Sequence, residues 1–175
     1  MNIILFGPPG AGKGTQAKHI VKNYNYFQIS TGDLLRIEIK KKTDHGKNIE
    51  KIISKGEFVS DDIVNTLLKN TINNLEFKDK IIFDGYPRNL IQAENLRKNL
   101  IEFSQNIGAI IFLNVTSDII NKRIAGRVTC EKCNMTLNEF LDPKEVELHP
   151  CGRSFLKKRK DDDHEVAIFR YDTYM

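Results

Sequence analysis

An apolar run at residues 3–6 leads directly into a glycine-rich segment, GPPGAGKGTQ, at residues 7–16. Where a strand, a glycine turn and a helix follow one another, several backbone N–H groups converge on one oxyanion at the positive end of the helix. A lysine in the turn can then reach the outer phosphates of a nucleotide. The segment therefore predicts an α/β fold with a phosphate-binding loop, whose nucleotide-binding residues are Gly10, Ala11, Gly12, Lys13, Gly14 and Thr15.

The hydroxyl of this loop is displaced by one position. The pattern G-x-x-x-x-G-K-[ST] has Ser or Thr immediately after the lysine, whereas this chain has Gly14 there and Thr15 next. Thr15 lies one residue further round the helix than the hydroxyl that usually ligates Mg²⁺. The shift weakens an assignment to the GTPases and the motor-type nucleotide hydrolases.

Four short apolar or β-rich runs, at residues 3–6, 26–29, 80–83 and 109–115, alternate with helical patterns. This alternation predicts a parallel sheet flanked by helices. Between the second and third runs we expect helices at residues 33–41 and 47–54 and a third helix from Ser60, whose hydroxyl can cap it. The connection is longer than one crossover needs, so it predicts a small helical subdomain.

The segment at residues 128–160 interrupts the helix expected after the fourth strand. It contains a CxxC pair, two prolines and clustered charges. These features indicate an inserted flap. After the flap we expect another helix, with an Asp cap and with Val166, Ile168 and Phe169 on its apolar side.

The flap contains a candidate metal site. Cys130 and Cys133 have the spacing of half a zinc site, and His149 and Cys151 can complete a Cys₃His set. Ser154 is an alternative fourth ligand, because it forms a C-x-x-S spacing with Cys151. A flap held by hydrogen bonds, with three unligated thiols, is the other possibility. A closed four-ligand zinc site would have a structural role, since it leaves no open position for chemistry.

Charged residues that suit phosphate chemistry recur along the chain. Asp84 ends the third predicted strand, where a carboxylate can bind Mg²⁺ directly or through water; the alternative is that it caps a turn or a helix. The arginines are Arg36, Arg88, Arg123, Arg127, Arg159 and Arg170. Any one of them could be a surface residue, but together they favour phosphoryl transfer, in which the protein supplies mainly position and positive charge.

The composition of the chain argues against several other classes of protein. The 175 residues are 40% hydrophobic, which suits one globular domain. No apolar stretch approaches the roughly 20 residues of a membrane helix, and the N-terminal run lacks the basic leader and the length of a signal peptide. The net charge of +4 is spread among acidic residues and does not favour nucleic acid. We therefore expect a cytoplasmic protein without a nucleic-acid or membrane partner. We also expect a monomer, which the composition itself does not establish.

Six motifs follow one another in the order of a known enzyme family: GPPGAGKGTQ, ISTGDLLR, GEFVSDDIV, FDGYPRNLIQA, RIAGR, and RKDD followed by Arg170. On these motifs, from residue 1 to about 170, the sequence resembles the adenylate kinases, in particular bacterial members with a zinc-finger-like lid. That family has Gly and then Thr after the loop lysine. The resemblance implies a single P-loop kinase domain with a core at residues 1–29, 60–121 and 161–175, an NMP-binding subdomain at 30–59 and a lid at 122–160.

The resemblance also implies the reaction Mg·ATP + AMP ⇌ 2 ADP and the residues that perform it. Catalytic positions would be Lys13, Asp84, Arg88, Arg123, Arg159 and Arg170. ATP would contact the loop residues together with Arg123 and Arg127. AMP would contact Thr31, Arg36, Glu57, Phe58, Val59, Gly85, Arg88, Gln92, Arg159 and Arg170, with Gly56 lending backbone. Asp84 would order the waters of Mg²⁺, and Asp161 and Asp162 would anchor the lid arginines.

Three alternatives are weighed against this enzyme. Pyrimidine-specific relatives tend to carry Asn where this chain has Gln92, whose amide can both donate to and accept from an adenine edge; this favours AMP over UMP or CMP. The family continues past Arg170 with another strand and a long helix, so one sheet edge would be bare and a truncated nucleotide-binding fragment with little activity is an alternative. A zinc-finger module that binds nucleic acid through KKRK is disfavoured, because the acidic residues 161–163 cancel that charge.

Overall fold

The computed structural model describes residues 1–55, 57, 59–73, 77–159, 162 and 164–174. The chain forms two compact units. The first contains Met1–Gly7, Gly12–Ile53 and Glu57–Asn114, and the second contains Pro8–Ala11, Ser54–Gly56 and Val115–Met175. Each unit is described by itself.

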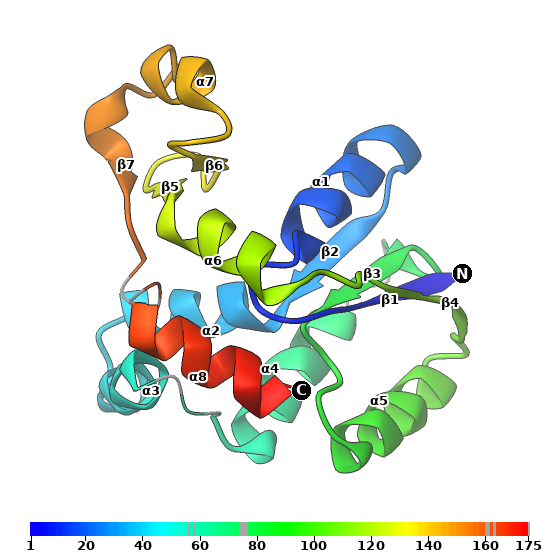
Figure 1. The fold of residues 1–175 in the computed structure, drawn as a ribbon. Helices are drawn as coiled ribbons and strands as arrows, with labels where there is room; N and C mark the ends of the chain where they lie inside the picture. Colours follow the sequence, from blue (N-terminus) through cyan, green and yellow to red (C-terminus); the bar gives the residue numbers. More distant parts are fainter. Residues whose placement is uncertain (56, 58, 74–76, 160–161, 163, 175) are drawn as a thin grey trace. The chain divides into compact units, whose positions relative to one another are not determined.

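The first unit is built on a four-stranded sheet (Figure 1). Its strands are β1 (Asn2–Phe6), β2 (Phe27–Ser30), β3 (Ile81–Asp84) and β4 (Ile107–Phe112), in the order β2-β3-β1-β4. Every neighbouring pair is parallel, which confirms the predicted parallel sheet. The fourth strand was predicted two residues too late at its start and three too late at its end, since residues 113–115 lie beyond it.

Alternate residues of the central strands face two different helical layers. Ile4, Ile29 and Phe83 pack in one cluster with apolar side chains of α4 (Asp61–Ile72) and α5 (Leu90–Glu102). Ile3, Leu5 and Ile82 pack in another cluster with Ala17 of α1 (Lys13–Tyr24). Strands buried on both faces need apolar residues at successive positions, which is why the predicted runs are nearly continuous in Ile, Leu and Phe. At the β4 edge, Ile110, Ile111 and Phe112 are exposed.

The predicted helices between β2 and β3 are present as α2 (Thr31–Lys40), α3 (Asp44–Ser54) and α4. Ser30 caps α2 by accepting a hydrogen bond from the backbone N–H of Asp33 at 3.3 Å. The prediction that the Ser60 hydroxyl caps α4 is wrong, because that side chain makes no capping hydrogen bond. Asp61 and Asp62 in the first turn of α4 still compensate the positive end of the helix.

From Val115 onward, the second unit contains α6 (Ser117–Ala125), which is followed by a small antiparallel sheet. Its strands β5 (Arg127–Cys130), β6 (Thr136–Asn138) and β7 (Leu156–Lys157) are arranged in the order β6-β5-β7. The short helix α7 (Pro143–Glu147) and a 3₁₀ turn at Arg153–Phe155 lie between β6 and β7. The segment that was predicted to interrupt the helical pattern therefore folds as this three-stranded sheet with its short helices.

The last helix of the described chain, α8 (His164–Tyr174), packs on α6 (Figure 1). Its buried contact is Ala167, which meets Ile120 and Ile124, with Tyr171 partly buried beside them. The predicted apolar side is wrong, since Ile168 and Phe169 are 40% and 51% exposed. A small residue is buried here because it lets two helices approach closely. The predicted Asp cap involves residues 161 and 163, which lie outside the described residues.

Candidate functional site

The glycine-rich loop connects β1 to α1, as its sequence predicts. Gly12 precedes α1 with a φ of 98°, a left-handed conformation that costs glycine little. No acidic residue occupies the first turn of α1, so the positive end of the helix is not neutralised by its own side chains. Lys13 Nζ donates to the backbone oxygen of Gly7 at 2.7 Å and thus folds back over the loop. This arrangement suits an incoming phosphate.

Within the second unit, the loop residues 8–11 pack on α6. A Cβ added to Gly10 would lie 3.0 Å from side-chain atoms of both Ile120 and Ile124. Arg123, on the same helix, donates from Nη1 to the backbone oxygen of Ala11 at 2.9 Å. Any larger residue at position 10 would push the loop away from the helix that carries Arg123.

Asp84 lies at the end of β3, opposite Leu5 of β1. Its side chain is buried, and its Oδ2 accepts a hydrogen bond from Gln28 Nε2 at 2.9 Å. Burial raises the pKa of this carboxyl, while the charges of Lys13 and Arg88 and the Gln28 hydrogen bond oppose the rise. Asp84 does not cap α5, because Asn89 occupies that position and accepts from the Gln92 backbone N–H. The carboxylate is therefore a candidate for Mg²⁺ and its waters.

The surroundings of Gly14 give a reason for a glycine, in place of serine or threonine, directly after the loop lysine. A Cβ at this position would lie 3.4 Å from Asp84 Oδ2 and 3.9 Å from Gln28 Nε2. A serine or threonine in its place would direct its hydroxyl into the space beside the carboxylate. The glycine leaves that space open next to the candidate Mg²⁺ site.

Arg88, Thr31 and Gly85 meet in the first unit. The Gly85 backbone oxygen accepts from Arg88 Nε at 2.8 Å and from Thr31 Oγ1 at 3.1 Å. Arg36 instead pairs with Asp33 of its own helix, at 2.6 Å. Of the other predicted AMP contacts, Glu57 is exposed and Val59 is buried, while Phe58 and Gly56 lie outside the described residues.

Gln92 is 5% exposed and its amide is held at both ends. Its Oε1 accepts from the Arg88 backbone N–H at 2.7 Å, and its Nε2 donates to Asp61 Oδ1. The Tyr86 hydroxyl donates to the backbone oxygen of Gln92 at 3.0 Å and lies 2.6 Å from Asn65 Oδ1. Burial and, to a lesser extent, the charge of Asp61 raise the pKa of Tyr86 to about 12, so it stays a neutral donor.

The arginines of the second unit have defined partners. Arg127 forms a two-point ion pair with Asp162, donating from Nε at 2.8 Å and from Nη2. Arg159 donates to Thr129 Oγ1 at 3.1 Å and to Thr136 Oγ1 at 3.3 Å. Arg170 is half-buried on α8. The pairing of Asp162 with an arginine agrees with its predicted anchoring role, whereas Asp161 lies outside the described residues.

A cluster of metal-ligating side chains lies in the second unit. Its candidate ligand atoms, from Cys130, Cys133, His149 and Cys151, are all within 4.8 Å of one another. The distance from Cys133 Sγ to His149 Nε2 is 3.5 Å. Tetrahedral zinc, with bonds of about 2.3 Å to sulfur and 2.0 Å to nitrogen, would place such a pair about 3.5 Å apart. His149, one of the two candidates for the fourth ligand, lies in this cluster.

The environment of the thiols suits a cation. Burial raises the pKa of Cys130, but hydrogen bonds from the Cys133 backbone, His149 and the Lys132 backbone outweigh it and bring the pKa to about 6. The pKa of Cys151 is raised to about 11, first by its hydrogen bond with Cys133 and then by burial. Neighbouring thiolates repel one another, and a cation bound among them would offset that repulsion. Buried His149 Nδ1 has no hydrogen-bond partner within the described part of the chain.

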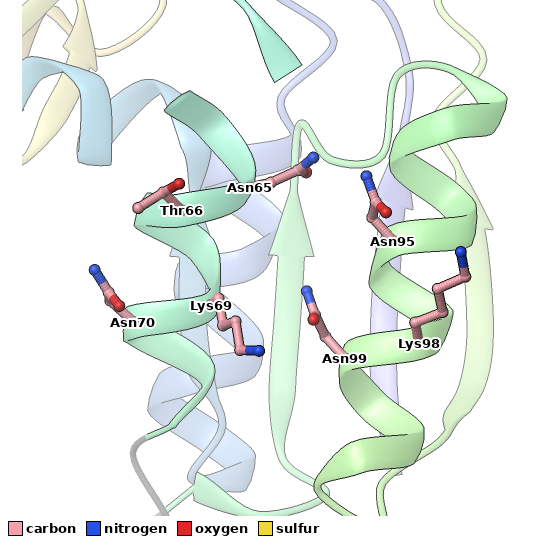
Figure 2. A pocket seen from close by; sticks show the side chains of 7 residues that line it. All are labelled: Asn65, Thr66, Lys69, Asn70, Asn95, Lys98 and Asn99. Atoms are coloured by element: carbon pink, nitrogen blue, oxygen red, sulfur yellow. The ribbon is translucent and has the colours of Figure 1, made fainter. Parts of the chain in front are cut away.

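A separate hollow of about 300 Å³ lies between α4 and α5 (Figure 2). Polar side chains from both helices line it, mostly amides and lysines: Asn65, Thr66, Lys69, Asn70, Asn95, Lys98 and Asn99. None of the predicted nucleotide-binding residues is among them. Lys69 pairs with Glu102 at 3.2 Å. The hollow is therefore not the predicted nucleotide site.

Known proteins similar to this chain agree on one family. The family model for adenylate kinase matches residues 5–175. The chain is 68% identical to the adenylate kinase of Pelagibacter ubique (strain HTCC1062) over 175 residues, which are 100% of this chain and 82% of that protein. The adenylate kinase of Petrotoga mobilis is 42% identical to this chain, over 99% of this chain and 80% of that protein. The adenylate kinase of Allorhizobium ampelinum is 40% identical, over 99% of this chain and 82% of that protein.

The chain belongs to the adenylate kinase family. As an adenylate kinase it is a nucleoside monophosphate kinase that transfers the terminal phosphoryl group of ATP to AMP, uses Mg²⁺ with ATP, and has ATP, AMP and ADP as substrates. The comparisons favour the enzyme over both a fragment without activity and a zinc-finger module. No helix in the described residues of this adenylate kinase is long and apolar enough to cross a membrane.

Two residues of the site were missed from the sequence of this adenylate kinase. Gln28 holds Asp84, and Asp61 holds Gln92. Gln28 lies within a strand, where a polar residue among apolar ones is a usable signal. Asp61 was assigned only to the helix terminus, and nothing local in the sequence points from it to Gln92.

Proposed function

We propose that the two nucleotides of the adenylate kinase reaction are bound by two sets of residues, which include the phosphate loop, Lys13 and the arginines. ATP is bound by Gly10, Ala11, Gly12, Lys13, Gly14, Thr15, Arg123 and Arg127. AMP is bound by Thr31, Arg36, Glu57, Phe58, Val59, Gly85, Arg88, Gln92, Arg159 and Arg170. Lys13, Asp84, Arg88, Arg123, Arg159 and Arg170 serve the transfer itself.

The observation that carries this proposal is the environment of Asp84 in the first unit. Its buried carboxylate interacts with the charges of both Lys13 and Arg88. A carboxylate at the end of a parallel strand, beside the strand that enters a phosphate loop, is where Mg²⁺ of a bound nucleoside triphosphate would be held through water. In the described residues, the only hydrogen bond to its side chain is that of Gln28 on Oδ2, which leaves Oδ1 for such a water.

The chemistry proposed for these residues is alignment and charge compensation. An AMP phosphate oxygen forms a bond to the γ-phosphorus while the bond from that phosphorus to the β–γ bridging oxygen breaks, and the electron pair stays on the leaving ADP. The attacking oxygen is already anionic, so no general base is needed. Lys13 exchanges its Gly7 carbonyl for phosphate oxygens, and the guanidinium groups offset the charge on the transferred group. Bound Mg²⁺ would neutralise phosphate charge beside Asp84.

We propose that the segments move as an NMP-binding subdomain at residues 30–59 and a lid at 122–160 on a core of 1–29, 60–121 and 161–175. Closure of two such parts would exclude water, which otherwise competes with AMP as acceptor. Zinc on Cys130, Cys133, His149 and Cys151 would hold the β5–β6 hairpin of the lid rigid and take no part in the chemistry. We also propose a cytoplasmic monomer without nucleic-acid or membrane partners; gel filtration and cell fractionation test this.

Replacement of Arg88 tests the assignment of the arginines. Arg88→Ala is expected to lower kcat by about a hundredfold or more, since loss of one group that stabilises transition-state charge costs this much. Its melting temperature should change little, because the side chain is exposed. Arg97→Ala is the matched control, an exposed arginine on α5 that is in none of the predicted sets, and it should keep full activity. Equal activity of the two variants would refute the role of Arg88.

A further inference from the structure

Asp61, at the start of α4, accepts hydrogen bonds from two side-chain amides. Asn89 Nδ2 lies 3.1 Å from Asp61 Oδ2, and Gln92 Nε2 donates to Asp61 Oδ1. The two NH₂ groups thus have two acceptor atoms, Oδ2 for Asn89 and Oδ1 for Gln92. A carboxylate offers both, whereas an amide at position 61 would set its own NH₂ against one of its neighbours.

The orientation of Asn89 is fixed independently of Asp61. Its Oδ1 caps α5 by accepting from the Gln92 backbone N–H at 2.8 Å, so its NH₂ must face Asp61. Gln92 Oε1 accepts from the Arg88 backbone N–H at 2.7 Å. The Gln92 amide is thus held with its oxygen towards Arg88 and its nitrogen towards Asp61. Because Gln92 is almost fully buried, water competes little with these two bonds.

We propose that Asp61 is a positioning residue that sets the base specificity of the AMP site, by fixing which end of the Gln92 amide donates. The inference rests on the proposed role of Gln92 in contacting the base of AMP. After the two bonds above, the amide retains one N–H and one oxygen lone pair, in a fixed order. A held amide of this kind distinguishes bases by the order of their donors and acceptors.

Adenine and hypoxanthine differ in that order. Adenine presents the N6 amino group as a donor beside a ring-nitrogen acceptor. Hypoxanthine carries an oxygen acceptor at position 6 beside the N1–H donor, so it needs the amide turned round. Turning the amide would place its NH₂ against the Arg88 N–H and its oxygen against the Asp61 carboxylate. The structure therefore assigns discrimination against IMP to Asp61 as much as to Gln92.

The test compares AMP and IMP as phosphoryl acceptors at saturating Mg·ATP. Asp61→Asn should raise the ratio of kcat/KM for IMP to kcat/KM for AMP about tenfold, because turning the buried Gln92 amide no longer leaves its oxygen facing a half-buried carboxylate. Asp61→Ala provides a second variant with the same expected shift. Asp62→Asn is the matched control: it removes the same charge from the next residue of the same helical turn, which is exposed, and its ratio should equal that of the wild type.

A Gln92→Leu variant separates failure of this inference from failure of the proposed function. If Gln92→Leu leaves the ratio at its wild-type value, Gln92 does not read the base, and its proposed role and this inference both fail. If Gln92→Leu changes the ratio while both Asp61 variants leave it unchanged, the role of Asp61 alone is overturned. A general structural defect would lower both kcat/KM values without moving their ratio.

Discussion

Gln28 Nε2 donates to Asp84 Oδ2 across 2.9 Å, joining the neighbouring parallel strands β2 and β3. The bond holds a carboxylate whose pKa is raised by burial from its ordinary value of 3.8. The protein thus keeps a charged group in a place where ionisation costs folding free energy. Such a cost at a candidate Mg²⁺ site is typical of a residue retained for function.

Asp84→Asn should raise the melting temperature at neutral pH and lower kcat. A raised folded-state pKa means that the stability contributed by the protonated carboxyl is complete below the unfolded pKa and is lost as the pH rises through the folded pKa. At pH 7 the wild type carries that loss and the Asn variant does not. Melting curves from pH 3 to 8 should therefore show a gain at neutral pH that shrinks towards acid. A lower melting temperature for Asp84→Asn at pH 7 would contradict this account.

Gly126→Ala should destabilise the protein by about 1–3 kcal/mol through overpacking. A Cβ at Gly126 would lie 2.6 Å from Phe140 Cδ2 and closer still to Asn138 Oδ1. Asn138 cannot retreat easily, because its Nδ2 donates to the Arg123 backbone oxygen at 2.8 Å. Denaturant unfolding measures the change, with Gly32→Ala as control, since there the Cβ meets the tip of the flexible Arg36 side chain. Equal stability of the two variants would argue against a tight contact at Gly126.

The sheet and the phosphate loop could be predicted because their signals are local. Apolar runs of strand length and the glycine-lysine segment are each contiguous in the sequence. The apolar side of α8 could not be predicted in this way. Burial of Ala167 in place of Phe169 depends on the approach of α6, and a small residue gives no hydrophobic signal of its own.

Part of the candidate site also depends on contacts between distant residues. Lys13, Asp84 and Arg88 were predicted from their motifs, whereas the support given by Gln28 and Asp61 was not. Asp61 and Gln92 are far apart in the sequence, and the direction of an amide is set only by the partners at its two ends. The helix-capping role assigned to Ser60 also failed, since a capping residue type does not by itself ensure the capping hydrogen bond.

Arg127 and Asp162 should show a coupling free energy of about 1–3 kcal/mol in a double-mutant cycle. The Asp162 side chain is 2% exposed and that of Arg127 is 19% exposed. Arg127→Ala leaves the buried Asp162 carboxylate without this partner and should therefore be strongly destabilising. The double variant Arg127→Ala/Asp162→Ala should then lose less stability than the two single variants lose in sum. Urea unfolding of the four proteins gives the coupling. A value near zero would mean that the pair does not anchor this arginine.

Zinc should be present and should stabilise the protein. Metal analysis of protein purified without chelator is expected to find a single zinc ion per chain, and Cys133→Ala should lose it and melt at a lower temperature. Ser154→Ala is the control, since it removes the alternative fourth ligand and should retain the metal. Zinc content near zero, or a Cys133→Ala protein that melts unchanged, would count against the site.

The central claim is that this chain transfers a phosphoryl group from ATP to AMP, and the initial rate of ADP formation tests it most directly. A coupled assay with both nucleotides and Mg²⁺ should give rapid turnover that disappears when AMP or Mg²⁺ is omitted, with two ADP formed for each ATP consumed. Arg88→Ala in the same assay should be nearly inactive. ADP formation at the same rate without AMP, or no turnover from a folded protein that binds ATP, would contradict the account.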